Sequence, residues 1–292
     1  MTKYLFKGLL TIFFLINTSA CTLSLADKVQ SARNLSKEHG FVEKLVQGDQ
    51  FLLTTYQKIT NQHLPFVFYV ESDGLVYDKY GAISENPTPQ DQLLLKLALV
   101  DNRPNVVYIA RPCQYTSPEI NPLCNSSIYW TERRMSEEVV SSINKAIETI
   151  NPLKQNFSLI GYSGGGGIVV IIAARNKYVK DILTIAGNLD TVYFNKYHDE
   201  LSANRMSSDT DSVKHTMEGS LNPIDYAMDV KNVPQLHLSG AEDKIVPPII
   251  AQNYVQYSDS LCVHQKIIPD VSHNVGWKEK WLDILAIPIK CN

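Results

Sequence analysis

The sequence lacks an excess of basic residues, internal repeats and long low-complexity segments. Its 292 residues include 27 Lys and Arg against 30 Asp and Glu, which gives a formal net charge of −3. Nucleic-acid-binding domains usually carry clustered Lys and Arg, so we expect no nucleic-acid partner. With 44% hydrophobic residues, the chain is long enough to bury one large core.

The N-terminal region has no apolar run long enough to span a membrane. Lys3 and Lys7 precede the apolar segment 9–16, which is shorter than the ~20 residues of a membrane-spanning helix. Small residues at 18–20 then precede Cys21. This order is typical of a secretory signal peptide over residues 1–21, so we expect an exported protein. An uncleaved anchor is the alternative.

The stretch TSAC at 18–21 resembles a bacterial lipobox, in which the cysteine becomes the lipidated first residue of the mature protein. The lipobox pattern prefers Leu where Thr18 stands. The resemblance implies lipidation of Cys21 and attachment to a membrane by the lipid. We therefore expect the protein in the bacterial cell envelope, either periplasmic or anchored as a lipoprotein.

Cysteine is scarce, and the count of five is odd. Lipidation of Cys21 leaves four, for which three pairings are possible. Two local disulfides, Cys113–Cys124 and Cys262–Cys291, are the simplest pairing in an exported protein; free thiols are the alternative. No pair has the CxxC spacing, so the sequence predicts no zinc site, and we expect no metal or cofactor.

Apolar segments alternate along the chain with segments of helical periodicity. The predicted strands are 65–71, 105–110, 157–162, 179–187, 234–240 and 264–270, and the predicted helices are 88–100, 136–150, 167–176 and 275–285. Several strands are apolar throughout, which indicates a parallel sheet covered on both faces. The sequence therefore predicts an α/β fold with a mostly parallel central sheet.

The domain organisation follows from the same pattern. Residues 22–50 are polar and mixed, and we expect a tether and a first helix there. Residues 51–292 form the α/β domain. The polar stretch at about 188–233 interrupts the alternation, and we interpret it as a small cap insertion.

The stretch FSLIGYSGGGGIVVIIAARN at 157–176 contains Gly161-Tyr162-Ser163-Gly164-Gly165, which matches the G-x-S-x-G nucleophile elbow. An apolar strand precedes the motif and an apolar helix follows it, as the elbow requires. No Lys follows these glycines, so the phosphate-loop pattern does not fit, and neither does G-x-G-x-x-G. A tight packing turn in a Rossmann-like protein is the alternative.

A nucleophilic serine needs a base and an acid, and in this fold they follow it in the order acid, then histidine. His273 follows the last predicted strand directly and is the candidate base. Asp243, in the loop after the preceding strand, is the candidate acid, and Glu242 is the alternative. Asp270 is interpreted as a turn residue. Each choice has a plainer reading, as a solvated or turn-forming loop residue.

Two backbone N–H groups are expected to bind the oxyanion. One belongs to Gly164, the residue after the serine. We expect the other from Leu75, because Gly74 in the loop ESDGLVYDKYG would let the backbone turn sharply. An ordinary β-turn is the alternative reading of this loop.

Over residues 50–290 the chain resembles the α/β-hydrolase superfamily, through the elbow, GAED after one strand and VSHN after the next. The stretches YVESDG, RPCQY, WTERR, AGNLD and SLNP also resemble a group of exported α/β hydrolases of Gram-negative bacteria. In that group the segment like YVESDG replaces the His-Gly oxyanion motif, which supports Leu75. The chain departs from the group at Ser72, where Gly is expected.

These features together predict a serine hydrolase that acts on a small-molecule carboxylic ester through Ser163, His273 and Asp243. No propeller-like module that would select peptides is recognised, so an ester is favoured over a peptide bond. A non-catalytic binding protein on the same fold, an acyltransferase and a peptidase are the alternatives. The sequence does not predict the oligomeric state.

Two further groups of residues could contact a substrate. Trp130, Arg133 and Arg134 lie in WTERR, and an arginine there would suit a carboxylate or phosphate, although a surface ion pair is the more common role. Aromatic residues of the predicted cap could shape the pocket or pack the cap down: Tyr193, Phe194, Tyr197 and His198.

Overall fold

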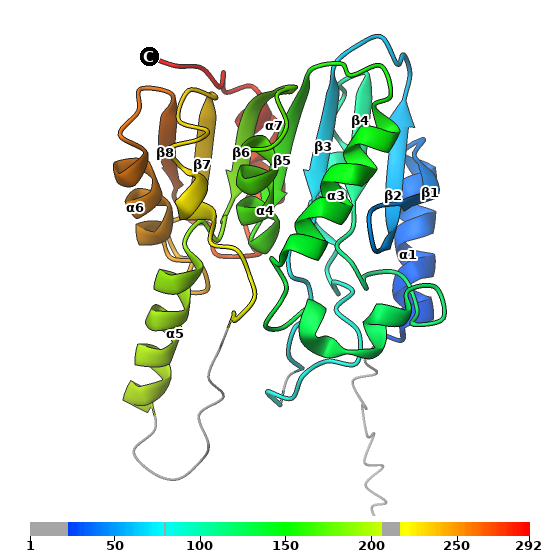
Figure 1. Cartoon of the computed structure of the whole chain (residues 1–292), viewed down its shortest axis with the longest axis horizontal. Coiled ribbons are helices and arrows are strands. Elements are labelled where there is room, and N and C mark those ends of the chain that lie inside the picture. The colour runs from blue at the N-terminus through cyan, green and yellow to red at the C-terminus, as the bar shows by residue number, and fades with distance from the viewer. Residues whose placement is uncertain (1–22, 79, 206–216) are drawn as a thin grey trace, which may run out of the picture.

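A central sheet runs through the whole molecule in the computed structural model, which describes residues 23–78, 80–205 and 217–292 (Figure 1). Eight strands in the described residues form this sheet in the order β1-β2-β4-β3-β5-β6-β7-β8. The strands are β1 (Val42–Gln47), β2 (Leu52–Ile59), β3 (Phe66–Val70), β4 (Asn105–Ile109), β5 (Phe157–Tyr162), β6 (Val179–Ile185), β7 (Gln235–Gly240) and β8 (Val263–Ile268). β2 pairs antiparallel with both β1 and β4, and all other neighbours are parallel.

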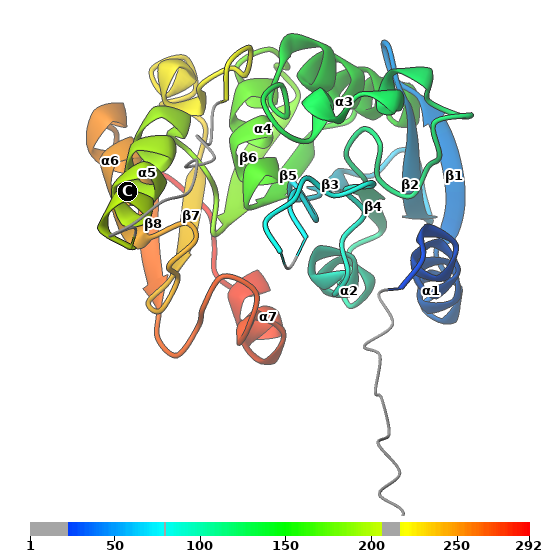
Figure 2. The ribbon, with the colours of Figure 1, turned by 90° about the horizontal axis from the view of Figure 1, so that it is seen from below.

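Helices cover both faces of this sheet (Figure 2). They are α1 (Leu25–Glu38), α2 (Leu93–Leu99), α3 (Glu137–Ile150), α4 (Gly164–Ala173), α5 (Thr191–Arg205), α6 (Pro248–Ser258) and α7 (Trp277–Leu285). Apolar residues of α3, α4 and α6 pack in one core cluster, and those of α1, α2 and α7 in a second cluster on the opposite face. The predicted α/β class, with a mostly parallel sheet between helices, is confirmed.

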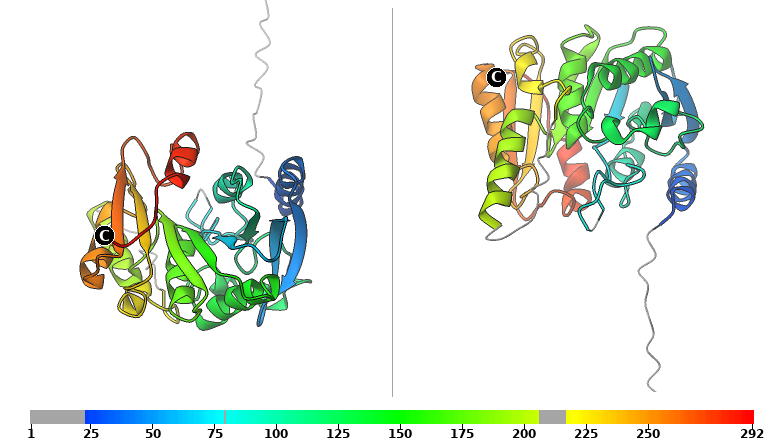
Figure 3. Two further views of the ribbon diagram at one scale, coloured as in Figure 1. Left: turned by 90° about the horizontal axis from the view of Figure 1, so that it is seen from above. Right: turned by 60° about the horizontal axis from the view of Figure 1, so that its bottom comes forward.

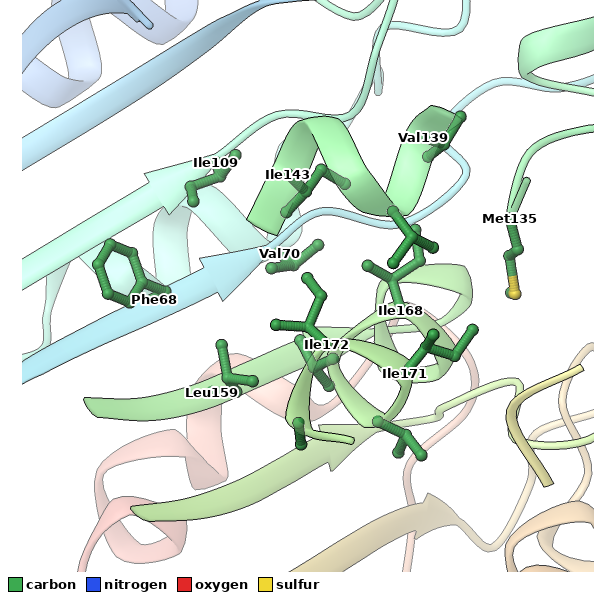
Figure 4. Packing of buried hydrophobic residues seen from close by; sticks show 14 of the residues in the cluster. Phe68, Val70, Ile109, Met135, Val139, Ile143, Leu159, Ile168, Ile171 and Ile172 are labelled. Atoms are coloured by element: carbon green, nitrogen blue, oxygen red, sulfur yellow. The ribbon is translucent and has the colours of Figure 1, made fainter. Parts of the chain in front are cut away.

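The central strands form because their sequences are apolar on both faces. Every residue of β3, β4 and β5 is buried, so these strands do not alternate between apolar and polar positions. In Figure 4, Ile143 of α3 and Ile172 of α4 lie near Val70 of β3, in the same core cluster as Leu159 of β5. Helix α3 meets the sheet because its apolar residues recur at helical spacing, as predicted.

The N-terminal part of the described chain contributes more than the predicted tether and helix. Helix α1 begins after Ser24, whose hydroxyl accepts a hydrogen bond from the N–H of Asp27 in a capping box. Residues 42–47 then form β1, the edge strand, so the sheet includes part of 22–50. The predicted signal peptide over 1–21, with Cys21, lies outside the described residues.

The predicted cap interval contains α5 and a 3-10 helix, η3 (Pro223–Tyr226), between β6 and β7. Helix α5 extends below the sheet in Figure 1, and Figure 3 shows it from two further sides together with the twist of the sheet from β1 to β8. Residues 206–216 of the interval lie outside the described residues. No helix in the described ranges is both long enough and apolar enough to cross a membrane.

Two disulfides join the four described cysteines in the predicted pairing. Cys113 is bonded to Cys124, which lies within the 3-10 helix η1 (Pro122–Asn125). A second 3-10 helix, η2 (Ser127–Tyr129), follows. Cys262 is bonded to Cys291 across a sequence separation of 29 residues. The second bond fixes the C-terminal end of the chain to the start of β8.

Candidate active site

The turn from β5 to α4 consists of a single residue, Ser163, in a conformation that residues with a Cβ rarely adopt. Its φ is 52° and its ψ is −119°. The Ser163 N–H donates to the Ile185 carbonyl, and its own carbonyl accepts from the N–H groups of Gly166 and Asn188, each at 2.9 Å. The neighbouring strand β6 and the loop after it therefore hold this strained turn in place.

The glycines on either side of the serine are required by close backbone contacts. A Cβ at Gly161 would lie 2.3 Å from the Gly165 carbonyl oxygen, and a Cβ at Gly165 would lie 2.2 Å from the Val70 carbonyl oxygen. Neither position therefore has room for a Cβ. A Cβ at Gly167 would lie 2.5 Å from the Asn188 carbonyl oxygen, so the glycine run forms the first turn of α4 beneath the loop after β6.

Three side chains from distant parts of the sequence form one chain of hydrogen bonds. Nε2 of His273 lies 3.1 Å from the Ser163 hydroxyl oxygen, and Nδ1 of His273 lies 2.9 Å from Oδ2 of Asp243. Oδ1 of Asp243 accepts from the N–H groups of Ile245 and Val246, at 2.8 and 2.9 Å. The Asp243 side chain is fully buried, and that of His273 is 12% exposed.

The structure brings Asp243 to the histidine and leaves the alternatives outside the site. Glu242 is exposed, and its N–H donates to the Val271 carbonyl. Asp270 is also exposed and has a positive φ of 57°, as suits the turn residue that the sequence predicts. His237, on β7, is fully buried, and burial lowers its pKa to about 3, with a smaller effect from His264. It stays neutral and lies within the sheet.

Sequence reasoning missed the residues that position the His273 loop. The Tyr162 hydroxyl and the Trp277 indole N–H both donate to the His273 carbonyl, at 3.1 and 2.9 Å. The Tyr162 ring also lies against the imidazole, with 5.3 Å between centroids. Tyr162 occupies the variable position before the serine in the motif, so the motif carries no signal for this role.

The prediction that Leu75 donates to the oxyanion is wrong. Its N–H donates to the Pro87 carbonyl at 3.0 Å, because the backbone at Gly74 turns with a φ of 69° and packs against Pro87. Within the described residues, the N–H groups of Asp73 and Gly164 have no acceptor. Asp73 lines the same cavity as the serine, so its N–H replaces that of Leu75 as the candidate donor beside Gly164.

A cavity of about 480 Å³ opens over the serine. Its lining includes Ser163, His273, Asp73, Leu75, Arg134, Phe194 and His198. Phe194 and His198 come from α5, so two of the predicted cap aromatics shape the cavity. Another cavity, of about 410 Å³, has Ile147 and Tyr178 in its lining but none of the three hydrogen-bonded residues of the serine site.

The two arginines of WTERR have different environments. Arg133 is partly exposed and forms an ion pair with Glu138, which is the surface role that the sequence favours. Arg134 is only 6% exposed and lines the cavity. Trp130 is buried in the hydrophobic core.

A buried carboxyl group supports the loop that carries Asp73. Glu71, at the end of β3, accepts hydrogen bonds from the Ser72 N–H and the Tyr108 hydroxyl, both at 2.7 Å. Burial raises its pKa to about 7, although both hydrogen bonds act in the opposite direction. Sequence reasoning gave no role to this residue, because a lone Glu after a strand is most often exposed.

The raised pKa of Glu71 predicts that stability falls as the pH rises. Because the folded protein binds its proton up to about pH 7, and the unfolded chain only up to about 4.5, stability is lost between these values. Over that window the wild type should lose on the order of 3 kcal/mol more than Glu71→Gln. Urea unfolding at intervals between pH 4.5 and 8 measures this difference, and parallel curves for the two proteins would contradict it.

Comparisons with known proteins agree with this architecture. No family model and no curated protein matches the sequence. Among solved structures, an esterase from Pyrococcus furiosus is 11% identical with a TM-score of 0.59, over 86% of this chain and 90% of its own. Est1E from Butyrivibrio proteoclasticus is 12% identical with a TM-score of 0.54, over 83% and 95%.

An acylaminoacyl peptidase from Pyrococcus horikoshii is 16% identical, with a TM-score of 0.55 over 82% of this chain. The matched region is 38% of the peptidase, so this chain corresponds to a little over a third of that protein. The strand order, the parallel pairing and these likenesses agree. The chain therefore has the fold of the α/β-hydrolase superfamily.

Proposed function

We propose that the protein is a serine hydrolase that cleaves a carboxylic ester through an acyl-enzyme. The observation that carries this proposal is the chain of hydrogen bonds from Ser163 through His273 to Asp243. Ser163 lies on a strained turn, and both Ser163 and His273 line a cavity. A hydroxyl needs an adjacent base to become nucleophilic, and the base needs a third group to orient it. Both relationships are present here.

In the acylation half of the reaction, the Ser163 hydroxyl attacks the ester carbonyl and gives its proton to Nε2 of His273. Asp243 accepts the hydrogen bond from Nδ1–H, which fixes the tautomer with a free Nε2 and stabilises the imidazolium that forms. The two backbone N–H groups that hold the Asp243 carboxylate keep it in place without neutralising it. His273 then gives the proton to the leaving alcohol.

The negative charge on the carbonyl oxygen is stabilised by N–H groups that are already in place. Those of Gly164 and Asp73 are the candidates, since neither has an acceptor among the described residues. In the second half of the reaction, water attacks the acyl-enzyme, His273 takes its proton, and Ser163 leaves with that proton. No metal or organic cofactor takes part in these steps.

An ester is favoured over an amide because of the solved structures that match over most of their own length. A protein named as an esterase is covered over 90%, whereas the acylaminoacyl peptidase is covered over 38%. A binding protein on the same fold would have no use for a strained serine and a buried acid hydrogen-bonded to a histidine. Acyl transfer, with an alcohol in place of water, uses the same residues.

One prediction of the proposed function concerns the nucleophile. A fluorophosphonate probe should label the wild type at Ser163 and should not label Ser163→Ala, because the probe reacts with an activated serine. Gel fluorescence and peptide mass spectrometry identify the site. Equal labelling of the two proteins would show that Ser163 is not the nucleophile. Absence of labelling, together with no turnover of p-nitrophenyl esters, would favour the non-catalytic binding protein.

Another prediction concerns the acid. Asp243→Asn should lower kcat about 10³- to 10⁴-fold, because the amide favours the wrong tautomer of His273. Asp270→Asn is the matched control: Asp270 is exposed, and Asn tolerates its positive φ, so kcat should stay within about twofold. Steady-state kinetics on p-nitrophenyl acetate measure both. Similar losses in the two variants would argue against the assignment of Asp243.

We also propose that the protein is exported and lipidated at Cys21. The two disulfides support export, because such bonds persist in oxidising compartments. Mass spectrometry of protein purified from a Gram-negative host should find a diacylglyceryl group on Cys21 as the mature N-terminus. A mature protein with a free, unlipidated N-terminus would be consistent with export but would exclude the lipid anchor. Retention of residues 1–20 would contradict both export and lipidation.

A further inference from the structure

Two arginines and one aspartate meet at the edge of the cavity, next to the elbow. Nη1 of Arg111 donates to Oδ1 of Asp73 at 3.1 Å, and Nε of Arg134 lies 3.6 Å from Oδ2 of the same carboxylate. Arg111 also donates through Nη2 to the Arg134 carbonyl. The group therefore joins the loop after β4, the loop after β3 and the segment before α3.

This group lies close to the reacting serine. A Cβ at Gly164 would be only 2.1 Å from Oδ1 of Asp73, so the carboxylate packs against the backbone of the residue after Ser163. Arg134 approaches the other oxygen of that carboxylate, Oδ2, and lines the same cavity as Ser163 and His273. A substrate bound at Ser163 would therefore have Arg134 within reach of its neighbouring groups.

The Arg134 guanidinium has too few partners for its burial. Its side chain is 7% exposed, and its buried Nε has no hydrogen-bond partner among the described residues. Its contacts are the distant carboxylate of Asp73 and the Phe194 ring, whose centroid is 5.9 Å away. Because a buried charge without hydrogen bonds is costly, such a group is expected where a ligand completes its partners.

The charges around Arg134 leave one positive charge unbalanced. Arg111 already neutralises Asp73 through a direct hydrogen bond and is itself only 4% exposed. Burial lowers the pKa of Arg111, and the charge of Arg134 acts in the same direction. Glu71 also lies near Arg111, but its oxygens accept from Ser72 and Tyr108.

Two other carboxylates, one buried behind His273 and one in the cavity lining, do not pair with Arg134. Asp243 is hydrogen-bonded to His273, and Asp91 is an exposed residue at the rim, with Oδ1 accepting from the Leu93 N–H. Neither has an ion pair with Arg134 in the described residues. The group of Arg111, Arg134 and Asp73 therefore keeps one net positive charge, and Arg134 and Asp73 line the cavity.

We propose that Arg134 binds an anionic group of the substrate, so that the preferred substrate is an ester that also carries a carboxylate or a phosphate. The proposal rests on the hydrolase function proposed above. The planar guanidinium suits the paired oxygens of either anion, and Phe194 covers one side of it. Arg134 thereby determines which ester is bound, while the chemistry stays with Ser163 and His273.

Pairs of esters that differ only in a charged group test this proposal. Monomethyl glutarate and methyl valerate differ by a carboxylate in the acyl part, and 4-acetoxybenzoate and 4-methylphenyl acetate by a carboxylate in the alcohol part. 4-Acetoxyphenyl phosphate provides the phosphate. In the wild type, kcat/KM should be about 10- to 100-fold higher for at least one anionic ester than for its neutral partner.

The variants separate the charge of Arg134 from its packing. In Arg134→Gln the ratio of kcat/KM between the anionic and neutral ester should fall about tenfold or more, and Arg134→Lys should retain part of it. Arg133→Gln is the matched control, because the adjacent arginine pairs with Glu138 and does not line the cavity; its ratio should equal that of the wild type. A ratio that Arg134→Gln leaves unchanged, or no anionic preference in the wild type, would overturn the proposal.

A binding measurement keeps this result separate from the hydrolase assignment. The amides that correspond to the two carboxylate esters, N-methylglutaramate and 4-acetamidobenzoate, are titrated by calorimetry into wild type and Arg134→Gln, with their uncharged analogues as controls. Tighter binding of one anionic amide to the wild type, lost in the variant, supports the proposal even where probe labelling of Ser163 fails. If the probe labels Ser163 but wild type and Arg134→Gln bind the anionic amides equally, the anion site is rejected and the hydrolase function stands.

Discussion

The strained backbone at Ser163 is the constraint on which the rest of the site depends. A residue with a φ of 52° and a ψ of −119° stays in that conformation only if its surroundings hold it. Here the last residue of β6 accepts a hydrogen bond from the Ser163 N–H, and the loop after β6 donates one to the Ser163 carbonyl. Close contacts at Gly161 and Gly165 let α4 begin directly at the sheet. The serine is therefore presented at the edge where the parallel strands end.

The topology brings the other two residues to the same edge. Asp243 follows β7 and His273 follows β8, and neighbouring parallel strands end side by side. The loop bearing the imidazole is held from two directions, by Tyr162 of β5 and by Trp277 at the start of α7. The positions of the three residues thus follow from the sheet, and their exact orientation follows from side chains that no short motif contains.

The sequence predicted the parts of the structure whose physical requirements are local. The fully apolar strands and the glycines of the elbow are of this kind. Asp243 and His273 could be predicted because in this fold the acid and the histidine follow the serine in a fixed order, each in a loop after a later strand. Strands β1 and β2 were missed because Lys, Gln and Thr interrupt their apolar pattern at the antiparallel edge. Leu75 was wrong because a motif cannot show that Pro87 already accepts its N–H. The burial of Arg134 could not be predicted from the sequence, because the residues that cover it lie far away along the chain.

The Cys262–Cys291 bond has a consequence for local unfolding. The loop that it closes contains β8, His273 and all of α7, but neither Ser163 nor Asp243. Such a cross-link restricts the conformations of the enclosed segment once its packing is lost. Opening of the last strand and helix, which would separate the imidazole from a serine still held in its turn, is therefore made rarer by this bond. Oxidation of Cys262 and Cys291 to a disulfide should therefore lengthen the time for which the His273 imidazole stays aligned with Ser163.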